Sequence, residues 1–502
     1  MYRVPRPNRD AHTVDAQANR RSVSTSDPTT SEPNSPTANT GDLMRSLCSP
    51  TTNGSMAFTA RYGGRTPTSR RIGRTIAKAV TAVLLLTIAV VIHPVAHADE
   101  GQYLEFYTPP NPLPPGVPGD LIRTEPSRLA LEPSGQLGTF VGVGTRIMYR
   151  STDAQGEPVA VTGTYIEPDN PWPGKGSRPL LAYATLPYGM GEQCAPSRLL
   201  SQGIHASLDS GFDVMLNIEE GFIATLLARG FAIMVTDGVG MGVHTDKSPQ
   251  WLNRAAGGHA LIDGARAAMK LPGTSLDPHG PVAFWGLLAG AHAALSAAEL
   301  ASTYGPELNV VGTYAAATPT DLATMIAPVD GNFLAGTTGY LLRGIAASYS
   351  QFEEPIKDAL TPRGLEMYEN TGRQCLVQTG IDYAFRHLKF WFKDDIYEMV
   401  KAEPFKTVLA TQRLGNVKPT GPVYFEHNRW DSFGEYQSVR ATAIDYCAKG
   451  ADVTLWTNEQ PPLFNKVSIN SLLPQFVDGE RSMAWITDRF NGLPTSPNCS
   501  EI

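Results

Sequence analysis

Residues 285–292, with the sequence WGLLAGAH, have the frame of a catalytic turn but lack its reactive side chain. The apolar run before Gly286 is typical of a buried parallel strand, and the alanine-rich run after Gly290 favours a helix. In a nucleophile elbow, G-x-S-x-G, such a strand-to-helix corner raises a serine above the sheet. The central residue here is Leu288, whose side chain has no lone pair to attack a carbonyl. An ordinary corner with a glycine at each end is the alternative interpretation.

The segments around this corner alternate between strand and helix patterns. From Pro179 to Ala316 the alternation predicts a mainly parallel sheet with helices on both faces. Two segments with a period of two residues come earlier and predict an antiparallel pair of strands. The predicted strands cover 138–150, 157–166, 179–186, 231–235, 281–285 and 421–425, and the predicted helices cover 219–229, 257–270 and 291–301.

The alternation stops after Ala316 and resumes only at 421–425. The segment between them, about 321–415, is helix-rich and carries aromatic clusters such as Phe390-Trp391-Phe392. We expect this insert to form a lid over the carboxyl ends of the strands, where α/β sheets bind ligands. A helical subdomain packed at the side of the sheet is the alternative.

The N-terminal region differs from the rest of the chain. Residues 1–70 are rich in Ser, Thr, Pro, Asn and Arg and predict a disordered extension. Residues 71–98 combine a basic start, a short uncharged run and an A-x-A site, which predicts a signal peptide cleaved after Ala98. An uncleaved anchor with a cytosolic tail is the alternative, although the apolar run is shorter than the ~20 residues that span a bilayer. The long leader suggests that translation starts at Met44 or Met56.

Charge and cysteine usage exclude several classes of protein. A net charge of −7 over 502 residues argues against nucleic-acid binding, which requires a basic face. Cys48 precedes the predicted signal, so Cys194, Cys375, Cys447 and Cys499 remain in the exported chain. Four cysteines in an exported domain indicate two disulfides, for which three connectivities exist. No pair has C-x-x-C spacing, so we expect no metal site, and we expect no cofactor.

Several motifs together resemble those of the secretory lipases, a bacterial and fungal family of α/β-hydrolases. The resemblance covers roughly residues 103–497 and implies an α/β-hydrolase fold over 99–502, a helical lid and an ester-cleaving Ser-Asp-His triad. It also implies a lipid or acyl-ester-like ligand. The motifs, in chain order, are GMGEQCAPS at 189–197, DGVGMG at 237–242, LIDGARAA at 261–268, GLLAGAHA at 286–293, YGPEL at 304–308 and YCAKGADV at 446–453.

Two of the three triad positions depart from the family pattern. Leu288 stands where the family has its serine, and no other G-x-S-x-G occurs in the chain. Asp431 corresponds to the retained acid. The histidine should follow the acid in the sequence, but none of the 10 histidines lies beyond His427, and Ser471 stands at that position. The backbone amide of Ala289 corresponds to one donor of the oxyanion hole.

The resemblance carries two further expectations. It implies the disulfides Cys194–Cys375, between the oxyanion-side loop and the lid, and Cys447–Cys499, at the C-terminal tail. A true elbow holds its central residue in a sparsely populated backbone conformation. We therefore expect Leu288 either to relax from that conformation or to be held in it by apolar burial under the lid.

Other candidate groups give weaker signals. His292 is interpreted as a packed or polar helix residue, and His244, Asp237 and Asp263 as loop and packing residues. His427 and Asp431 lie four residues apart after a predicted strand. An alternative to the acid role of Asp431 is therefore that the two residues bind a metal ion together.

The sequence therefore favours an exported pseudoenzyme with no hydrolytic triad. We expect a secreted or cell-envelope protein, monomeric, that binds a lipid-like ligand or an envelope partner. One alternative is an active triacylglycerol lipase or carboxylesterase with a nonstandard nucleophile, for which Ser197 and Thr185 are the first candidates. Another is an adhesin or structural protein with a filled cleft. An open apolar pocket above Leu288 would favour ligand binding over the filled cleft.

Overall fold

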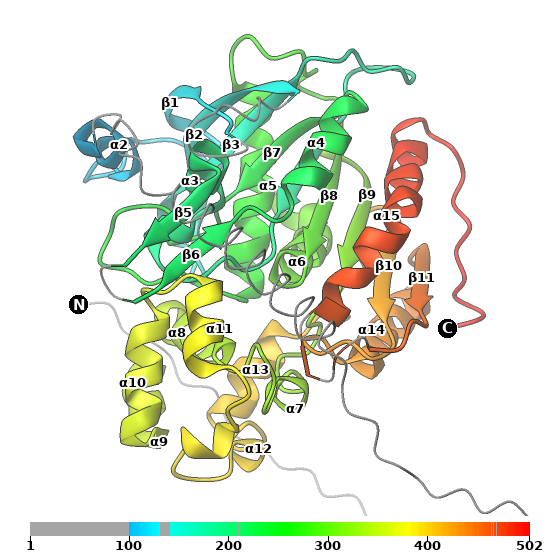
Figure 1. Ribbon diagram of the computed structural model, residues 1–502. Helices are drawn as coiled ribbons and strands as arrows, with labels where there is room; N and C mark the ends of the chain where they lie inside the picture. The colour runs from blue at the N-terminus through cyan, green and yellow to red at the C-terminus, as the bar shows by residue number, and fades with distance from the viewer. Residues whose placement is uncertain (1–99, 131–140, 209–210, 463, 465, 468) are drawn as a thin grey trace, which may run out of the picture. The chain divides into compact units, whose positions relative to one another are not determined.

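A nine-stranded sheet forms the centre of the computed structural model, in the order β1-β2-β3-β7-β4-β8-β9-β10-β11 (Figure 1). The pairs from β1 to β7 are antiparallel, and every pair from β7 to β11 is parallel. The predicted antiparallel pair is therefore β2 and β3. The strands are β1 Leu121–Ser127, β2 Gly142–Thr152, β3 Pro158–Pro168, β4 Leu180–Ala184, β7 Ala232–Thr236, β8 Pro281–Leu287, β9 Asn309–Ala316, β10 Val423–Asn428 and β11 Val453–Asn458.

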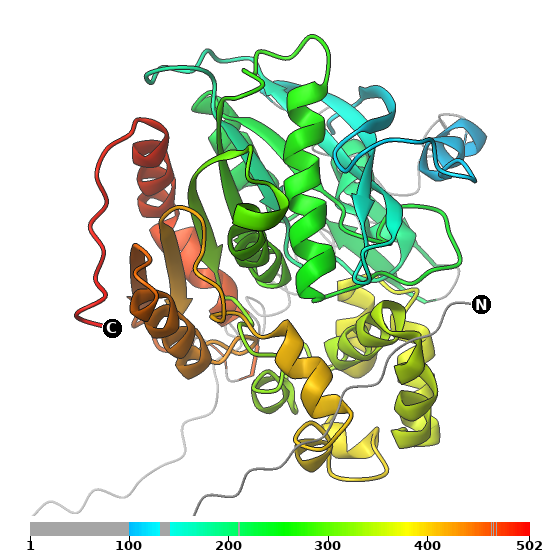
Figure 2. The same cartoon turned by 180° about the vertical axis from the view of Figure 1, so that it is seen from behind.

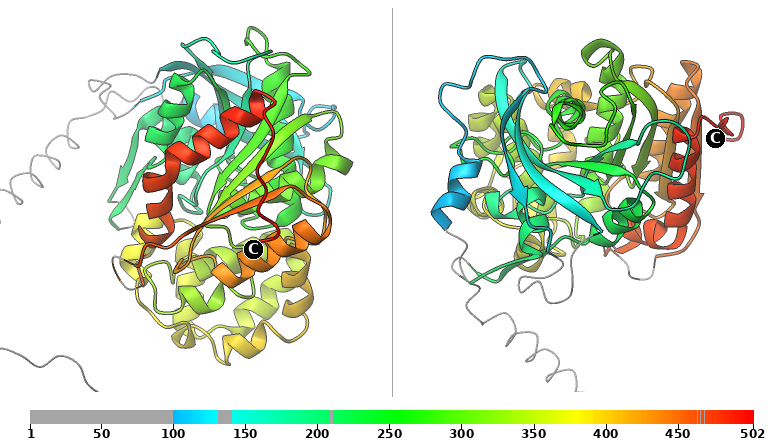
Figure 3. Two further views of the ribbon diagram at one scale, coloured as in Figure 1. Left: turned by 90° about the vertical axis from the view of Figure 1, so that its right-hand side faces the viewer. Right: turned by 90° about the horizontal axis from the view of Figure 1, so that it is seen from above.

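Helices cover both faces of this sheet (Figures 1, 2 and 3). Side chains alternate along each strand, so Leu180 and Ala182 of β4 pack with α5 and α6 on one face. Leu181 and Tyr183 pack with α4 and α15 on the other. This arrangement is the α/β-hydrolase fold that the family resemblance implied. The covering helices are α3 Pro196–Gln202, α4 Glu220–Ala228, α5 Arg254–Lys270, α6 Ala289–Tyr304, α14 Tyr436–Ala448 and α15 Ile469–Phe490.

A helical insert separates β9 from β10 in the sequence, although the two strands are paired in the sheet. Its helices gather below the sheet in Figure 1, in yellow-green to orange. Leu334 and Leu341 of the insert belong to the same large hydrophobic cluster as Leu287 and Leu288 at the end of β8. Its helices are α7 Ile326–Val329, α8 Thr337–Ser348, α9 Glu353–Ala359, α10 Pro362–Thr371, α11 Leu376–Tyr383, α12 Ile396–Met399 and α13 Phe405–Gln412, with the short 3₁₀ turns Ser350–Phe352 and Leu388–Phe390.

Smaller elements lie outside the sheet and the insert. The helix α2, Glu100–Tyr107, precedes β1, and the 3₁₀ turn η1, Glu192–Cys194, precedes α3. The strands β5, Ile204–Ser207, and β6, Asp213–Leu216, form a separate antiparallel pair.

Both disulfides implied by the family resemblance are present. Cys194–Cys375 joins η1 to the residue that precedes α11, and therefore ties the loop after β4 to the insert. Cys447–Cys499 joins the end of α14 to the C-terminal tail. Disulfides of this kind typically contribute about 2–4 kcal/mol each.

The structure describes residues 100–130, 141–208, 211–462, 464, 466, 467 and 469–502, which belong to one unit of the chain. The predicted extension over 1–70 and the predicted signal peptide over 71–98 lie outside the described residues. Within the described ranges, no helix is both long and apolar enough to cross a membrane.

Candidate active site

The corner between β8 and α6 has the tight geometry of an elbow. Leu288 separates the two elements and has φ 52° and ψ −115°, a conformation that side-chain-bearing residues rarely adopt. A Cβ added at Gly286 would lie 2.2 Å from the carbonyl oxygen of Gly290. One added at Gly290 would lie 2.0 Å from the carbonyl oxygen of Ala184 on β4. The close approach of backbone to backbone therefore requires both glycines of the G-x-x-x-G frame.

Apolar burial holds Leu288 in this conformation. Its side chain is only 4% exposed and belongs to the hydrophobic cluster that includes residues of the insert. Such a backbone conformation costs about 1–3 kcal/mol, and full burial of a leucine contributes about 1.5–3 kcal/mol. The two effects are of similar size, so the corner keeps the elbow backbone although a leucine gains nothing catalytic from it. Of the two expected outcomes, relaxation and burial, the structure shows burial.

Truncation of Leu288 separates backbone strain from side-chain packing. We expect Leu288→Ala to lose about 2–5 kcal/mol of unfolding free energy, because a buried leucine is removed. Leu288→Gly should be more stable than Leu288→Ala by about 1 kcal/mol, because glycine adopts positive φ without strain. Urea unfolding of the two variants measures which is more stable. At most positions the alanine variant would be the more stable of the two. A glycine variant less stable than the alanine variant would show that Leu288 is not strained.

A cavity of about 100 Å³ lies beside the corner. Ala289 and Gly290 form part of its wall, whereas Leu288 does not. As the first residue of α6, Ala289 has a backbone amide without an intrahelical acceptor, so this amide is available to a ligand oxygen. The cavity is smaller than the roughly 300–1,000 Å³ of typical ligand sites. The other lining residues are Ala184, Thr185, Leu186, Pro187, Tyr188, Gly189, Cys194, Pro196, Thr236, Asp237, Gly238, Val239, Met241, Pro249, Gln250, Trp251, Leu252, Gly257 and Ala293.

Asp431 lies in the turn that follows β10. Its Oδ1 accepts hydrogen bonds from the amides of Phe433 at 2.7 Å and Gly434 at 2.8 Å, which fix the orientation of the carboxylate. Its Oδ2 is buried and has no hydrogen-bond partner among the described residues. The turn therefore leaves one oxygen of the Asp431 carboxylate without a hydrogen-bond donor among the described residues.

Ser471 lies in the first turn of α15 and is 1% exposed. Its Oγ is also buried without a hydrogen-bond partner in the described part of the chain. The hydroxyl of Ser432, beside Asp431, donates to the carbonyl of Val467 at 3.5 Å, so the acid turn contacts the segment before α15. Buried polar groups are normally paired. Asp431 Oδ2 and Ser471 Oγ are two of several exceptions to this rule among the described residues.

The strand ends that precede Leu288 and Asp431 lie at one edge of the sheet. The amide of Leu288 donates to Ala316 at the end of β9, over 2.9 Å. The amide of Ala317, the next residue, donates to Glu426 near the end of β10, over 3.0 Å. The carboxyl ends of β8, β9 and β10 therefore meet. At this edge Asp431 follows β10, and Leu288 stands at the corner between β8 and α6.

The histidines nearest in sequence to these positions have structural partners. His292 is buried in α6, and its Nε2 lies 3.1 Å from the carbonyl oxygen of Gln412. Burial lowers the pKa of His292 to about 4, so it is neutral at physiological pH. His427 Nε2 lies 2.9 Å from the carbonyl oxygen of Gly434, the residue whose amide binds Asp431. Neither His427 nor Asp431 belongs to the single cluster of three or more potential metal ligands found among the described residues.

Ser197, a candidate nonstandard nucleophile, is fully buried beside a carboxylate rather than an imidazole. Its Oγ donates to Asp237 Oδ2 at 2.5 Å and lies 3.0 Å from the hydroxyl of Tyr107. Burial raises the pKa of Asp237, and the hydrogen bonds from Ser197 and Thr162 offset part of this effect. Thr185, the other candidate, lies in the cavity wall. The hydrogen bond from Ser197 to Asp237, the residue after β7, anchors α3 to the end of that strand, which is a structural role for Ser197.

Asp263 and His244 also have structural partners. Asp263 is buried on α5, accepts from Ser151 Oγ at 2.7 Å and pairs with Arg266 at 2.7 Å. His244 is exposed and lies 3.1 Å from a carboxylate oxygen of Glu192. These contacts agree with the interpretation of both residues as loop and packing residues.

Glu219 positions the cavity wall and was not singled out from the sequence. Its buried carboxylate accepts from the amide of Leu186 at 2.8 Å and from the hydroxyls of Tyr183 and Tyr188, each at 2.9 Å. Leu186 and Tyr188 belong to the loop that lines the cavity. Burial raises the pKa of Glu219 to about 7, despite these three hydrogen bonds. No local sequence pattern marks a glutamate that acts through partners more than 30 residues away.

The buried glutamate predicts a pH dependence of stability. The pKa of Glu219 is about 7 in the folded chain and about 4.3 in an unfolded one. The folded state therefore binds more protons between these values, and the unfolding free energy falls as the pH rises through this window. We expect Glu219→Gln to remove part of that fall, of the order of 2 kcal/mol. Urea unfolding of the unmodified protein and of Glu219→Gln at pH 5 and pH 8 measures this fall. If the unfolding free energy of both proteins changed equally between the two pH values, Glu219 would not be the group with the raised pKa.

Comparison with known proteins assigns the family. The profile described as secretory lipase matches residues 206–498. The chain belongs to the secretory lipase family. Among its relatives, this secretory lipase homologue is 28% identical to a probable inactive lipase of Mycobacterium tuberculosis, over 78% of this chain and 82% of that protein. It is 26% identical to a secreted triacylglycerol lipase of Malassezia furfur, over 67% of this chain and 84% of that protein.

Solved structures show the same fold for this secretory lipase homologue. Candida antarctica lipase A in its closed state has a TM-score of 0.65 and 23% identity, covering 79% of this chain and 88% of that one. The rice cell wall degrading esterase LipA of Xanthomonas oryzae, as a G231F mutant, has a TM-score of 0.61 and 16% identity. That comparison covers 74% of this chain and 100% of the esterase.

Proposed function

We propose that this member of the secretory lipase family is a pseudoenzyme that has lost ester hydrolysis. The observation that carries the proposal is Leu288, which occupies the apex of an elbow whose backbone is otherwise kept. An aliphatic side chain can neither attack a carbonyl carbon nor give up a proton to a base. The second loss, at Ser471, is independent of the first. The relative named a probable inactive lipase is consistent with an inactive branch of the family.

The retained elbow cleft is proposed to bind a lipid-like ligand. Ala289, whose backbone amide corresponds to one oxyanion-hole donor of the family, remains in the cavity wall. The cavity of about 100 Å³ is too small for a long acyl chain. Entry of such a ligand therefore requires the cavity to widen. We propose that the insert takes part in this change as a lid, because the disulfide Cys194–Cys375 joins it to the loop that lines the cavity. The filled-cleft alternative predicts no ligand binding at all.

We further propose that the protein is exported and monomeric and acts at the cell envelope or outside it. The predicted signal peptide supports export, as do the secreted relatives in Malassezia. The disulfide framework of the described domain suits an oxidising compartment.

Filling the cavity tests the ligand-binding proposal. Ala293 lies on α6 in the cavity wall, so Ala293→Leu should lower the affinity for a fluorescent long-chain fatty acid by at least about tenfold, through steric exclusion. Ser302→Leu adds the same side chain at an exposed position of α6 and should leave the affinity unchanged. Fluorescence titration of the three purified proteins measures the difference. No saturable binding to the unmodified protein, or equal binding by both variants, would contradict ligand binding in this cleft.

A further inference from the structure

The small sheet formed by β5 and β6 turns its apolar side chains outward. Over residues 212–219, buried residues alternate with residues that are half-buried or exposed. Ile204 of β5 is paired with Leu216 of β6, so these two side chains lie on the same face. We call this face the outer face. Its residues are all apolar, namely Ile204, Ala206, Leu208, Phe212, Val214, Leu216 and Ile218.

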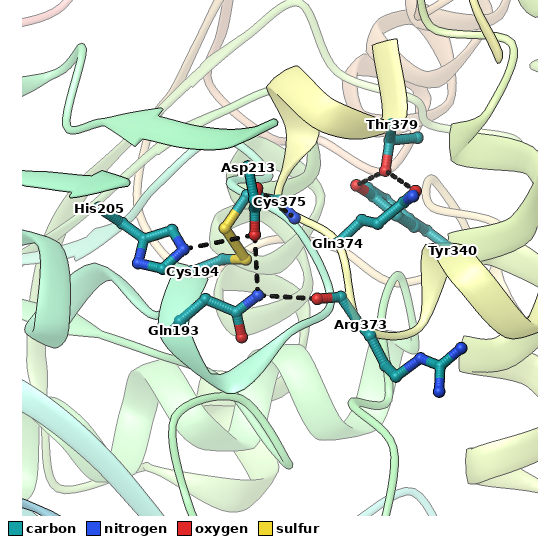
Figure 4. The surroundings of a disulfide bond; sticks show 9 residues. All are labelled: Gln193, Cys194, His205, Asp213, Tyr340, Arg373, Gln374, Cys375 and Thr379. Carbon is teal, nitrogen blue, oxygen red and sulfur yellow. Dashed lines mark hydrogen bonds and ion pairs between the residues drawn. A yellow bond between two sulfur atoms is a disulfide. The ribbon is translucent and has the colours of Figure 1, made fainter. Parts of the chain in front are cut away.

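Hydrogen bonds hold the polar side chains of this segment on the inner face. Asp213 is buried, and its Oδ2 accepts from Gln193 Nε2 at 3.0 Å (Figure 4). Asn217 Oδ1 accepts from the hydroxyl of Tyr188 at 2.6 Å, and the buried Glu219 has the three donors described above. A shift of register by one residue would turn this whole set to the other face. The inner hydrogen bonds therefore fix the apolar face toward solvent.

Folding alone does not explain this apolar face. An antiparallel sheet with one solvated face normally turns its polar residues to the water. Leu208, Phe212 and Leu216 are instead 78%, 57% and 45% exposed. Because contiguous exposed apolar patches on soluble proteins mark interaction sites, the outer face is a candidate docking surface.

The size and composition of the outer face favour a lipid bilayer over a protein as its partner. Its seven residues are far fewer than the about 20–30 on each side of a stable protein interface. None of them has a hydrogen-bonding side chain, whereas protein interfaces carry about one hydrogen bond per 100–200 Å². A bilayer takes up single apolar side chains and requires no hydrogen bond from them.

We propose that the outer face of β5 and β6 docks the protein on a lipid bilayer, with Leu208, Phe212 and Leu216 inserted among the acyl chains. This proposal deepens the proposed role at the cell envelope and rests on it. A separate two-stranded sheet has two backbone edges, which hydrocarbon cannot satisfy, so the insertion is shallow and limited to side chains. The outer face has no charged residue, so salt does not screen the attraction. Because β6 contacts α11 of the insert, the docked sheet lies against the proposed lid.

Vesicle binding by the purified secreted chain, with both disulfides intact, tests the proposal. We expect the protein to co-sediment with phosphatidylcholine vesicles to the same extent at low and high salt. Leu208→Ser/Phe212→Ser should lower the partition coefficient at least about tenfold, because two inserted side chains lose their apolar surface. The matched control Val417→Ser/Ile444→Ser replaces two exposed apolar residues outside the small sheet and should bind as the unmodified protein does.

The depth of insertion is measured with Phe212→Trp. Its fluorescence, after subtraction of the signal of the unmodified protein, should be quenched by vesicles of brominated lipids. Bromine near the headgroup end of the acyl chains should quench more than bromine near their methyl ends, because the insertion is shallow.

Two measurements separate docking from ligand binding in the cleft. Ala293→Leu should leave vesicle binding unchanged, and Leu208→Ser/Phe212→Ser should leave the affinity for the fluorescent fatty acid unchanged. Thermal melts report whether each variant is folded, and Leu216→Ser serves if the double variant is not.

Three results would overturn the docking proposal. They are an unmodified protein that stays in solution beside the vesicles, equal vesicle binding by Leu208→Ser/Phe212→Ser, and release of the bound protein by salt. Sedimentation equilibrium without vesicles tests the other occupant of this face. A dimer that is lost in the double variant would assign the outer face to a second copy of the chain, against the proposal.

Discussion

The double variant Leu288→Ser/Ser471→His is expected to hydrolyse short p-nitrophenyl esters. Leu288→Ser alone should stay nearly inactive, because a serine needs a neighbouring base to be activated. Ser471→His alone should be inactive, because it has no nucleophile to serve. A positioned general base contributes about 10²–10⁴-fold. The double variant should therefore exceed Leu288→Ser by at least about 10²-fold, far more than the sum of the single effects.

The structure gives each restored group a place. A serine at position 288 would inherit the elbow conformation of φ 52° and ψ −115°, and the amide of Ala289 would follow it. An imidazole at position 471 would replace the buried Ser471 Oγ, and Asp431 Oδ2, which it would have to reach, is also buried and unpaired among the described residues. Asp431 needs no rearrangement, because two amides already fix its Oδ1. The larger side chain costs about 1–3 kcal/mol of stability through overpacking.

The pH profile and one further substitution identify the restored mechanism. Activity should rise with pH through a pKa near 6.5, because only the neutral imidazole accepts the serine proton. Addition of Asp431→Asn to the double variant should abolish most of the gain, since the carboxylate orients the imidazole and stabilises its charged form. A folded double variant without activity would mean that the backbone has drifted, or that Ser471 is not the histidine position. Activity that survives Asp431→Asn would contradict the role of the acid.

The sheet and the elbow could be predicted because local patterns encode them. Period-two alternation marked β2 and β3, apolar runs marked the parallel strands, and the two glycines marked the corner. The family resemblance then implied both disulfide pairs, which spacing alone left open. The sequence also located the loss of chemistry, because Leu288 is visible as soon as the corner is recognised.

Side chains that act across long sequence separations could not be predicted. Glu219 supports the loop at Leu186, 33 residues away, and Ser197 is tied to Asp237, 40 residues away. Such hydrogen bonds follow from the way the chain folds and leave no periodic signal. The strain at Leu288 was anticipated as one of two outcomes, and only the burial of its side chain in the folded protein decided between them.

The turnover of short p-nitrophenyl esters by the purified unmodified protein tests the central claim most directly. We expect a rate equal to that of the heat-denatured protein in the same buffer, because the elbow carries Leu288 and no histidine follows Asp431. Ser197→Ala and Thr185→Val should leave this background unchanged. Clear turnover that is abolished by replacing one of these two residues, or another serine, would show a relocated nucleophile. The protein would then be an active esterase, and the pseudoenzyme proposal would be wrong.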